Sequence, residues 1–246
     1  MTPHEAIALG RERTSKLIAV AGAFFPRDVE TTRRHDDWGV AGPAFVARST
    51  RLAHALLELP DEHEPAAGVL LRVLYEHVTL FAWIAVDPPN NAPRWVRYDR
   101  EQKLKAHNDA QAAFGLQLLK SEAKAAFEAE RDAIADGLPG VPVLAKQADS
   151  HWSTRIQGFS TDLYGLRGLY LAVYRQFSPL VHGSTDSLHR IVAGGPRPGV
   201  VSVGIEAALK EFNAFTIAPL VYALGLFVSG VTLGFPSRQS VLDALV

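Results

Sequence analysis

The chain has 246 residues, 48% hydrophobic and 21% charged, a balance that supports a packed core and excludes a disordered chain. It has 25 basic and 26 acidic side chains, so its net charge of −1 provides no overall attraction to nucleic acid or to an anionic membrane. Cysteine is absent, which excludes disulfides, thiolate zinc sites and cysteine nucleophiles. We expect a cytoplasmic protein.

The N-terminal part predicts two helices. Residues 3–24 have helical length, and His4, Glu5 and the arginines that follow interrupt the apolar run that a secretion signal needs. After the helix-breaking residues 39–43, Phe45 is followed by leucines at positions 52, 56 and 59. Those offsets of seven, four and three indicate an amphipathic helix with one buried face.

Further helices are predicted over residues 66–86, 94–116, 120–135, 159–181 and 206–233, separated by short Gly- and Pro-rich segments. The stretch 214–234 has no charge and is long enough to span a membrane. Its Pro219, its glycines and its hydroxyl residues favour a central buried helix instead, so we expect no membrane partner.

The predicted fold is therefore all-α: a multi-helix bundle around an apolar C-terminal helix, with a small accessory β-hairpin near 191–203 where two Val-rich runs flank a Gly/Pro turn. We predict one domain over 1–246. It comprises N-terminal helices in 1–60, a core bundle in 66–233 and a C-terminal tail in 234–246.

Motif searches exclude several classes of function. The chain has no phosphate-binding P-loop, no dinucleotide-binding glycine pattern and no DNA-binding motif. His182, Asp186 and His189 do not have the spacing of a metal-binding motif. We therefore expect neither a cofactor nor a metal.

The strongest candidate for chemistry is the segment from Tyr174 to His182. Arg175 and His182 are seven positions apart, so on a regular helix they lie on one face, with Ser178 between them. Arginine can neutralise a phosphate and histidine can transfer a proton near neutral pH. Pro179 disfavours helical geometry at the preceding residue, so Ser178 is interpreted as the cap of a helix that starts at Pro179.

Arg72 and Glu76 are four residues apart in an otherwise apolar helix, so they share a face and must be paired. The pair is either a structural salt bridge or a support in which Glu76 orients Arg175 or His182. Trp152, next to His151, is either a buried residue or a ring that stacks on a base.

Arg94, Arg97 and Arg100 lie in the densest basic stretch of the chain, interleaved with Trp95 and Tyr98. This pattern is typical of a surface that holds an RNA backbone, and it also fits a solvated helix face.

Six residues separate Arg175 from His182, a spacing that resembles the Arg-x(4–6)-His signature of the HEPN superfamily of helical, RNA-cleaving proteins. A wider similarity covers four stretches of the chain. They are the run from Arg72 through Glu76, the Pro-rich stretch after Asp87, His151-Trp152, and Tyr174-Arg175 with Ser178 and His182-Gly183. Together these residues resemble a bacterial all-helical family catalogued as a domain of unknown function, number five-six-seven-seven, over roughly residues 66–184. The superfamily resemblance implies that Arg175 binds phosphate, that His182 is the acid or base, and that the site is completed across a homodimer.

Our first functional hypothesis is a metal-independent endoribonuclease of the toxin or phage-defence type, with RNA as substrate and Arg175 and His182 as catalytic residues. The alternative is a non-catalytic helical module that recognises a phosphate- or carboxylate-bearing ligand. A third hypothesis is an enzyme that acts on a small metabolite and uses Glu76 and Tyr174 beside the same residues.

Overall fold

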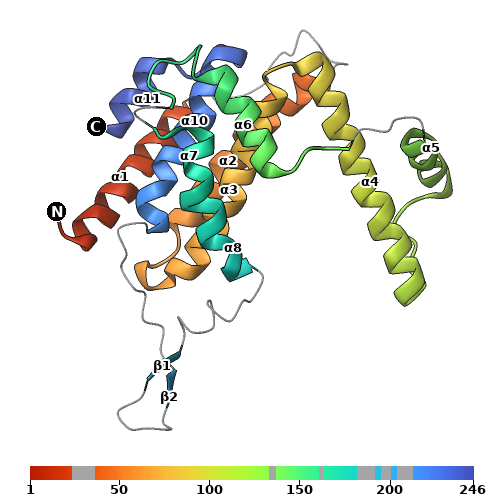
Figure 1. Ribbon diagram of the computed structural model, residues 1–246, viewed down its shortest axis with the longest axis horizontal. Helices are drawn as coiled ribbons and strands as arrows, with labels where there is room; N and C mark the ends of the chain where they lie inside the picture. Colours follow the sequence, from red (N-terminus) through yellow and green to blue (C-terminus); the bar gives the residue numbers. More distant parts are fainter. Residues whose placement is uncertain (24–36, 133–136, 161–162, 182–191, 195–200, 204–212) are drawn as a thin grey trace.

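A computed structural model of the chain describes residues 1–23, 37–132, 137–160, 163–181, 192–194, 201–203 and 213–246 (Figure 1). These residues form a multi-helix bundle, so the predicted all-α fold is confirmed. The long helices α1 (Pro3–Gly22), α2 (Asp37–Leu57), α3 (Glu64–Ile84) and α10 (Ala214–Leu233) make the body of the molecule. A 3₁₀ turn, η1 (Asp61–His63), leads into α3.

Helix α10 is the central helix, as its apolar sequence predicts. It packs against α1, α2 and α3, and almost all of its residues from Ala214 to Ser229 are buried. Asn213 caps its first turn by accepting a hydrogen bond from the Phe215 amide at 2.8 Å. Within the described residues, α10 and the segment Asp61–Ile84 have the length and composition of membrane spans, and most of each apolar window is buried inside the bundle.

Helix α2 differs from its prediction at its start. Residues 39–43 were expected to break the chain, yet α2 begins at Asp37 and runs through Pro43. Proline removes one backbone hydrogen bond and its ring crowds the carbonyl one turn back, a cost that is tolerated where tertiary packing compensates. Farther along, Phe45 and Leu56 are buried, which confirms the predicted apolar face.

Helices α4 (Pro88–Phe114) and α5 (Ser121–Asp132) form an arm that projects away from the body (Figure 1). The Pro-rich stretch after Asp87, predicted as a loop, belongs to α4, because Pro88 and Pro89 occupy first-turn positions whose amides have no helical partner. Gly115, with a φ of 67°, ends α4. Buried His107 holds the turn: its Nδ1 accepts hydrogen bonds from the amides of Leu118 and Leu119, both at 3.0 Å.

Two helices were not predicted from the sequence. Helix α6 (Val141–Trp152) packs on α3, and α11 (Arg238–Leu245) occupies the segment that the sequence suggested was a tail and packs on α1. Ser237 caps α11 by accepting the Ser240 amide at 3.1 Å. Both helices are short, so their apolar faces are brief patterns that the sequence alone does not distinguish from a loop.

The predicted hairpin is described only in part. Val192–Gly194 (β1) pairs antiparallel with Val201–Val203 (β2), with Val192 opposite Val203. The residues between and around these two three-residue segments lie outside the described part of the chain.

Candidate functional site

Arg175 lies on a helical segment that changes its winding. The predicted single helix 159–181 is observed as α7 (Gly165–Leu169), a π-helical stretch η2 (Tyr170–Arg175) and α8 (Gln176–Val181), which follow one another without a break. Stretches of π-helix are rare and frequently mark functional sites. Arg175 is exposed and is the last residue of η2.

Ser178 is not a helix cap, contrary to the interpretation from Pro179. Both residues lie inside α8, which begins at Gln176. In a regular helix the amide of residue 179 would bond to the carbonyl of residue 175, which is where the winding changes from π to α. The hydrogen bond that Pro179 cannot make would therefore fall where the winding changes from π to α, and the helix continues through Pro179.

His182 and Gly183 lie outside the described residues. Whether Arg175 and His182 share one helix face therefore stays a prediction.

The structure brings Arg72, Glu76 and Tyr174 together between α3 and η2. Arg72 is 8% exposed, and its Nε donates a hydrogen bond to Oε1 of Glu76 at 3.0 Å. Its Nη2 donates to the Tyr174 hydroxyl at 3.4 Å, and its guanidinium carbon lies 4.6 Å from the centre of the Tyr174 ring. The predicted pairing of Arg72 with Glu76 is thus observed, and a cation–π contact adds to it.

A second aromatic ring extends this cluster. Tyr170 stacks on Tyr174 with the ring centres 5.2 Å apart. The two tyrosines are four positions apart, as neighbours on a helix face are, and this spacing is the signal in the sequence that could have identified Tyr170. One turn further, the backbone of α3 at Gly68 closely approaches the buried Phe177 ring of α8. These contacts fix η2 and α8 against α3.

One nitrogen of the Arg72 side chain has no partner. Its Nη1 is buried and makes no hydrogen bond in the structure. Leaving a buried donor unpaired typically costs about 1–3 kcal/mol, and more for a charged group. The half-exposed Glu76 balances the charge of Arg72 but does not satisfy this donor.

The predicted RNA-contact arginines are engaged within the protein. Arg97 is 7% exposed and lies 3.9 Å from Glu101. Arg94 donates to the Gly137 carbonyl at 3.3 Å and covers the Trp83 ring, while Arg100 covers the ring of Phe127 on α5. Their contacts support the arm and its junction with the body.

Trp152 belongs to the core. It is 1% exposed, and its Nε1 donates to the Ala82 carbonyl at 2.9 Å. The neighbouring His151 has a pKa lowered by burial and then by the charge of Arg155. Of the two predictions for Trp152, a buried residue and a ring that stacks on a base, the structure agrees with the first.

Asp149 is a polar residue that the sequence analysis did not single out. Its Oδ1 accepts a hydrogen bond from the Leu166 amide at 3.0 Å and so holds the first turn of α7, the helix that leads into η2. Burial raises the pKa of this carboxyl, and its hydrogen bonds oppose the shift. Asp149 of α6 therefore positions the start of the segment from α7 to α8 that carries Arg175.

No group of three or more metal-ligating His, Asp or Glu side chains occurs within the described part of the chain. The polar cluster beside Arg175 in the chain therefore comprises Arg72, Glu76, Tyr170 and Tyr174 among the described residues.

A family model for a family of unknown function, DUF5677, matches residues 44–195, more than half of the chain. The chain belongs to this family. The DUF5677 match includes α3, the α4–α5 arm, α6 and the whole segment from α7 to α8, so both the cluster around Arg72 and the residue Arg175 lie within the matched region. No curated protein and no solved structure matches the chain.

Proposed function

We propose that the protein cleaves RNA without a metal, as an HEPN-like endoribonuclease of the toxin or phage-defence type, with Arg175 and His182 as its catalytic residues. The observation that supports this proposal best is the position of Arg175. It is exposed at the end of a π-helical stretch, directly after Tyr174, whose ring holds the second guanidinium, that of Arg72.

In the proposed reaction, Arg175 binds a non-bridging phosphate oxygen and stabilises the charge that accumulates in the transition state. His182 accepts the proton of the RNA 2′-hydroxyl while the 2′-oxygen bonds to phosphorus. The bond from phosphorus to the 5′-oxygen breaks, and the leaving oxygen takes a proton from water. The hydroxide so formed takes the proton from His182, which returns to its neutral form. The products are a 2′,3′-cyclic phosphate and a free 5′-hydroxyl.

A homodimer is part of the proposal. The end of the α4–α5 arm exposes Phe114, Leu116 and Leu118, which are 77%, 54% and 58% exposed. Neighbouring exposed apolar side chains favour contact with another protein surface. Light scattering after size-exclusion chromatography should give twice the 26.8 kDa chain mass, and a monomer would contradict this part of the proposal.

The direct test is RNA cleavage in EDTA by Arg175→Ala and His182→Ala. We expect at least a hundredfold loss of rate in each variant, since a general base and a group that stabilises transition-state charge each typically contribute about this much. Arg51→Ala is the matched control, because Arg51 is also an exposed helical arginine. Equal cleavage by the parent and both variants, or no cleavage by the parent, would contradict the catalytic proposal.

A second candidate function is a non-catalytic module that recognises a phosphate or carboxylate. The unpartnered Nη1 of Arg72 favours it, because an anion's oxygen would satisfy that buried donor. This function predicts that nucleotides raise the unfolding temperature without being converted. Arg72→Lys, which keeps the charge but has one nitrogen, should abolish that stabilisation.

A further inference from the structure

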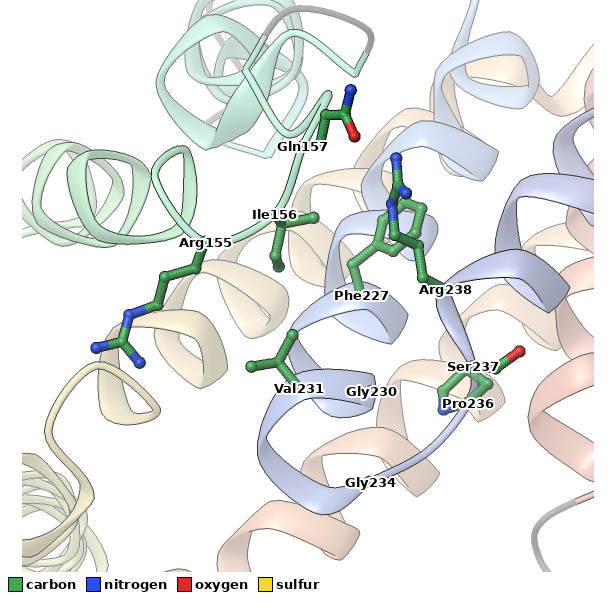
Figure 2. Close-up of a pocket in the computed structure, with 10 residues that line it drawn as sticks. All are labelled: Arg155, Ile156, Gln157, Phe227, Gly230, Val231, Gly234, Pro236, Ser237 and Arg238. Carbon is green, nitrogen blue, oxygen red and sulfur yellow. The ribbon is translucent and has the colours of Figure 1, made fainter.

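A separate cavity lies at the junction of the α6–α7 connection, the end of α10 and the start of α11. Its volume is about 300 Å³, at the lower end of the range for small-molecule sites. Figure 2 shows three apolar side chains that line it, those of Ile156, Phe227 and Val231. None of its lining residues belongs to the cluster around Arg72.

The floor of the cavity is apolar. Ile156 and Phe227 are each 4% exposed, while Val231 is 53% exposed and so presents a free side chain at the opening. These three side chains form an apolar surface, and an apolar group of a ligand that contacts it would be removed from water, which is favourable.

The wall of the cavity is held rigidly. The Ser229 hydroxyl donates to the Phe235 carbonyl at 2.6 Å, and Gly230 leaves room for the Pro236 carbonyl, which a side chain there would displace. Gly234 has a φ of 77°, which lets the chain turn from α10 toward α11. These contacts hold the wall of the cavity in place, which limits the entropy lost on binding.

The rim of the cavity is cationic. Arg155 and Arg238 line it, and no Asp or Glu is among its ten lining residues. Within the part of the chain that the structure describes, neither guanidinium has an ion-pair partner. In Figure 2 the Arg238 side chain extends past Phe227 toward Gln157, whereas Arg155 turns away from the floor.

We propose that this cavity binds a small amphipathic anion. The ligand's apolar part, the size of one ring or a short acyl chain, covers Ile156, Phe227 and Val231, and its carboxylate or phosphate pairs with Arg238. Arg155 adds positive potential at the rim. The apolar floor and the cation are both required, which distinguishes this ligand from a bare phosphate and from a neutral hydrocarbon.

Phenyl phosphate is the test ligand, with inorganic phosphate and benzyl alcohol as its two halves. The amide signals of Gly230 and Gly234 in a ¹⁵N-labelled protein report binding at the site. We expect saturable shifts with phenyl phosphate and at least tenfold weaker binding of each half. Repeating the titration with hexanoate distinguishes an acyl ligand from an aromatic one.

Arg238→Gln should weaken phenyl phosphate roughly ten- to a hundredfold, as expected when a charge-assisted hydrogen bond is removed. Val231→Trp should fill the opening and abolish binding. Both positions are exposed, so both variants should fold, and Arg51→Gln serves as the control that binds normally. The proposal is overturned if phenyl phosphate produces no saturable shift, if Arg238→Gln binds like the parent, or if inorganic phosphate binds equally well.

Discussion

The close approach of α3 to α8 leads to a sharp prediction for Gly68→Ala. A methyl group at position 68 would lie 2.6 Å from Cε1 of Phe177, well inside van der Waals contact. Phe177 is fully buried, so its ring has no open space into which to move. The substitution therefore acts on the contact that fixes α8, two residues from Arg175.

Two effects of opposite sign determine the change in unfolding free energy. Replacing glycine by alanine inside a helix normally stabilises by about 0.8–1 kcal/mol. Inserting a methyl group into a closely packed contact destabilises by about 1–3 kcal/mol. Because the obstacle is an enclosed aromatic ring, we expect the second effect to prevail, with a net loss of about 1–2 kcal/mol and a Tm lower by about 2–8 °C.

Urea unfolding and thermal melting of the purified protein measure this change. Gly22→Ala is the matched control, because Gly22 ends α1 with no atom within 4 Å of the added methyl group, and it should be neutral or slightly stabilising. In a Phe177→Leu background, Gly68→Ala should be less harmful by about 1 kcal/mol, since the smaller side chain makes room. A Gly68→Ala protein as stable as the parent would refute this account of the helix crossing.

Three other predictions concern stability. Burial, then the charge of Arg48, lowers the pKa of His77 to about 4. Only the unfolded state then binds this proton between pH 6.5 and 4, so the protein should lose about 3 kcal/mol as the pH falls through that window. His77→Gln should flatten this loss in urea unfolding measured at pH 7 and pH 4.5, and an unchanged loss would assign it to other groups. His107→Ala removes the acceptor for two amides in the turn between α4 and α5. Hydrogen exchange in α5 should therefore accelerate about tenfold or more, while the Tm changes little. Equal protection of α5 in the variant and the parent would show that His107 does not hold the arm. Tyr222→Phe removes the buried 2.7 Å hydrogen bond to Thr50 and should cost about 1 kcal/mol in thermal melts, whereas Tyr164→Phe at an exposed site should have no effect.

Much of the helical architecture follows from patterns of local residues. The apolar composition of α10 identifies a central helix because no other position in a bundle tolerates a helix that is apolar all round. The four-residue spacing of Arg72 and Glu76 predicts their pairing, since charges on a largely buried face need partners. The breaker residues were less informative, because Pro43, Pro93 and Pro179 all lie inside helices.

The family assignment could also be made from the sequence. The residues between Arg72 and Gly183 resembled the family whose model matches residues 44–195. The catalytic assignment of Arg175 and His182 stays a prediction. Ser178 shows how a local rule fails: proline favours a helix start in isolation, while packing of Phe177 against α3 keeps the helix continuous.

The sequence by itself determined that the long helices α1, α3 and α10 form, that Phe45 and Leu56 lie on a buried face, and that Arg72 needs a partner, because these depend on neighbours within a few residues. Only the tertiary structure decided that Tyr174 is one of those partners, that Arg94 donates a hydrogen bond to Gly137, and that α10 and α11 enclose a cavity with Arg238 at its rim. Those contacts join residues far apart in the chain, and side-chain spacing carries no information about which distant surfaces will meet.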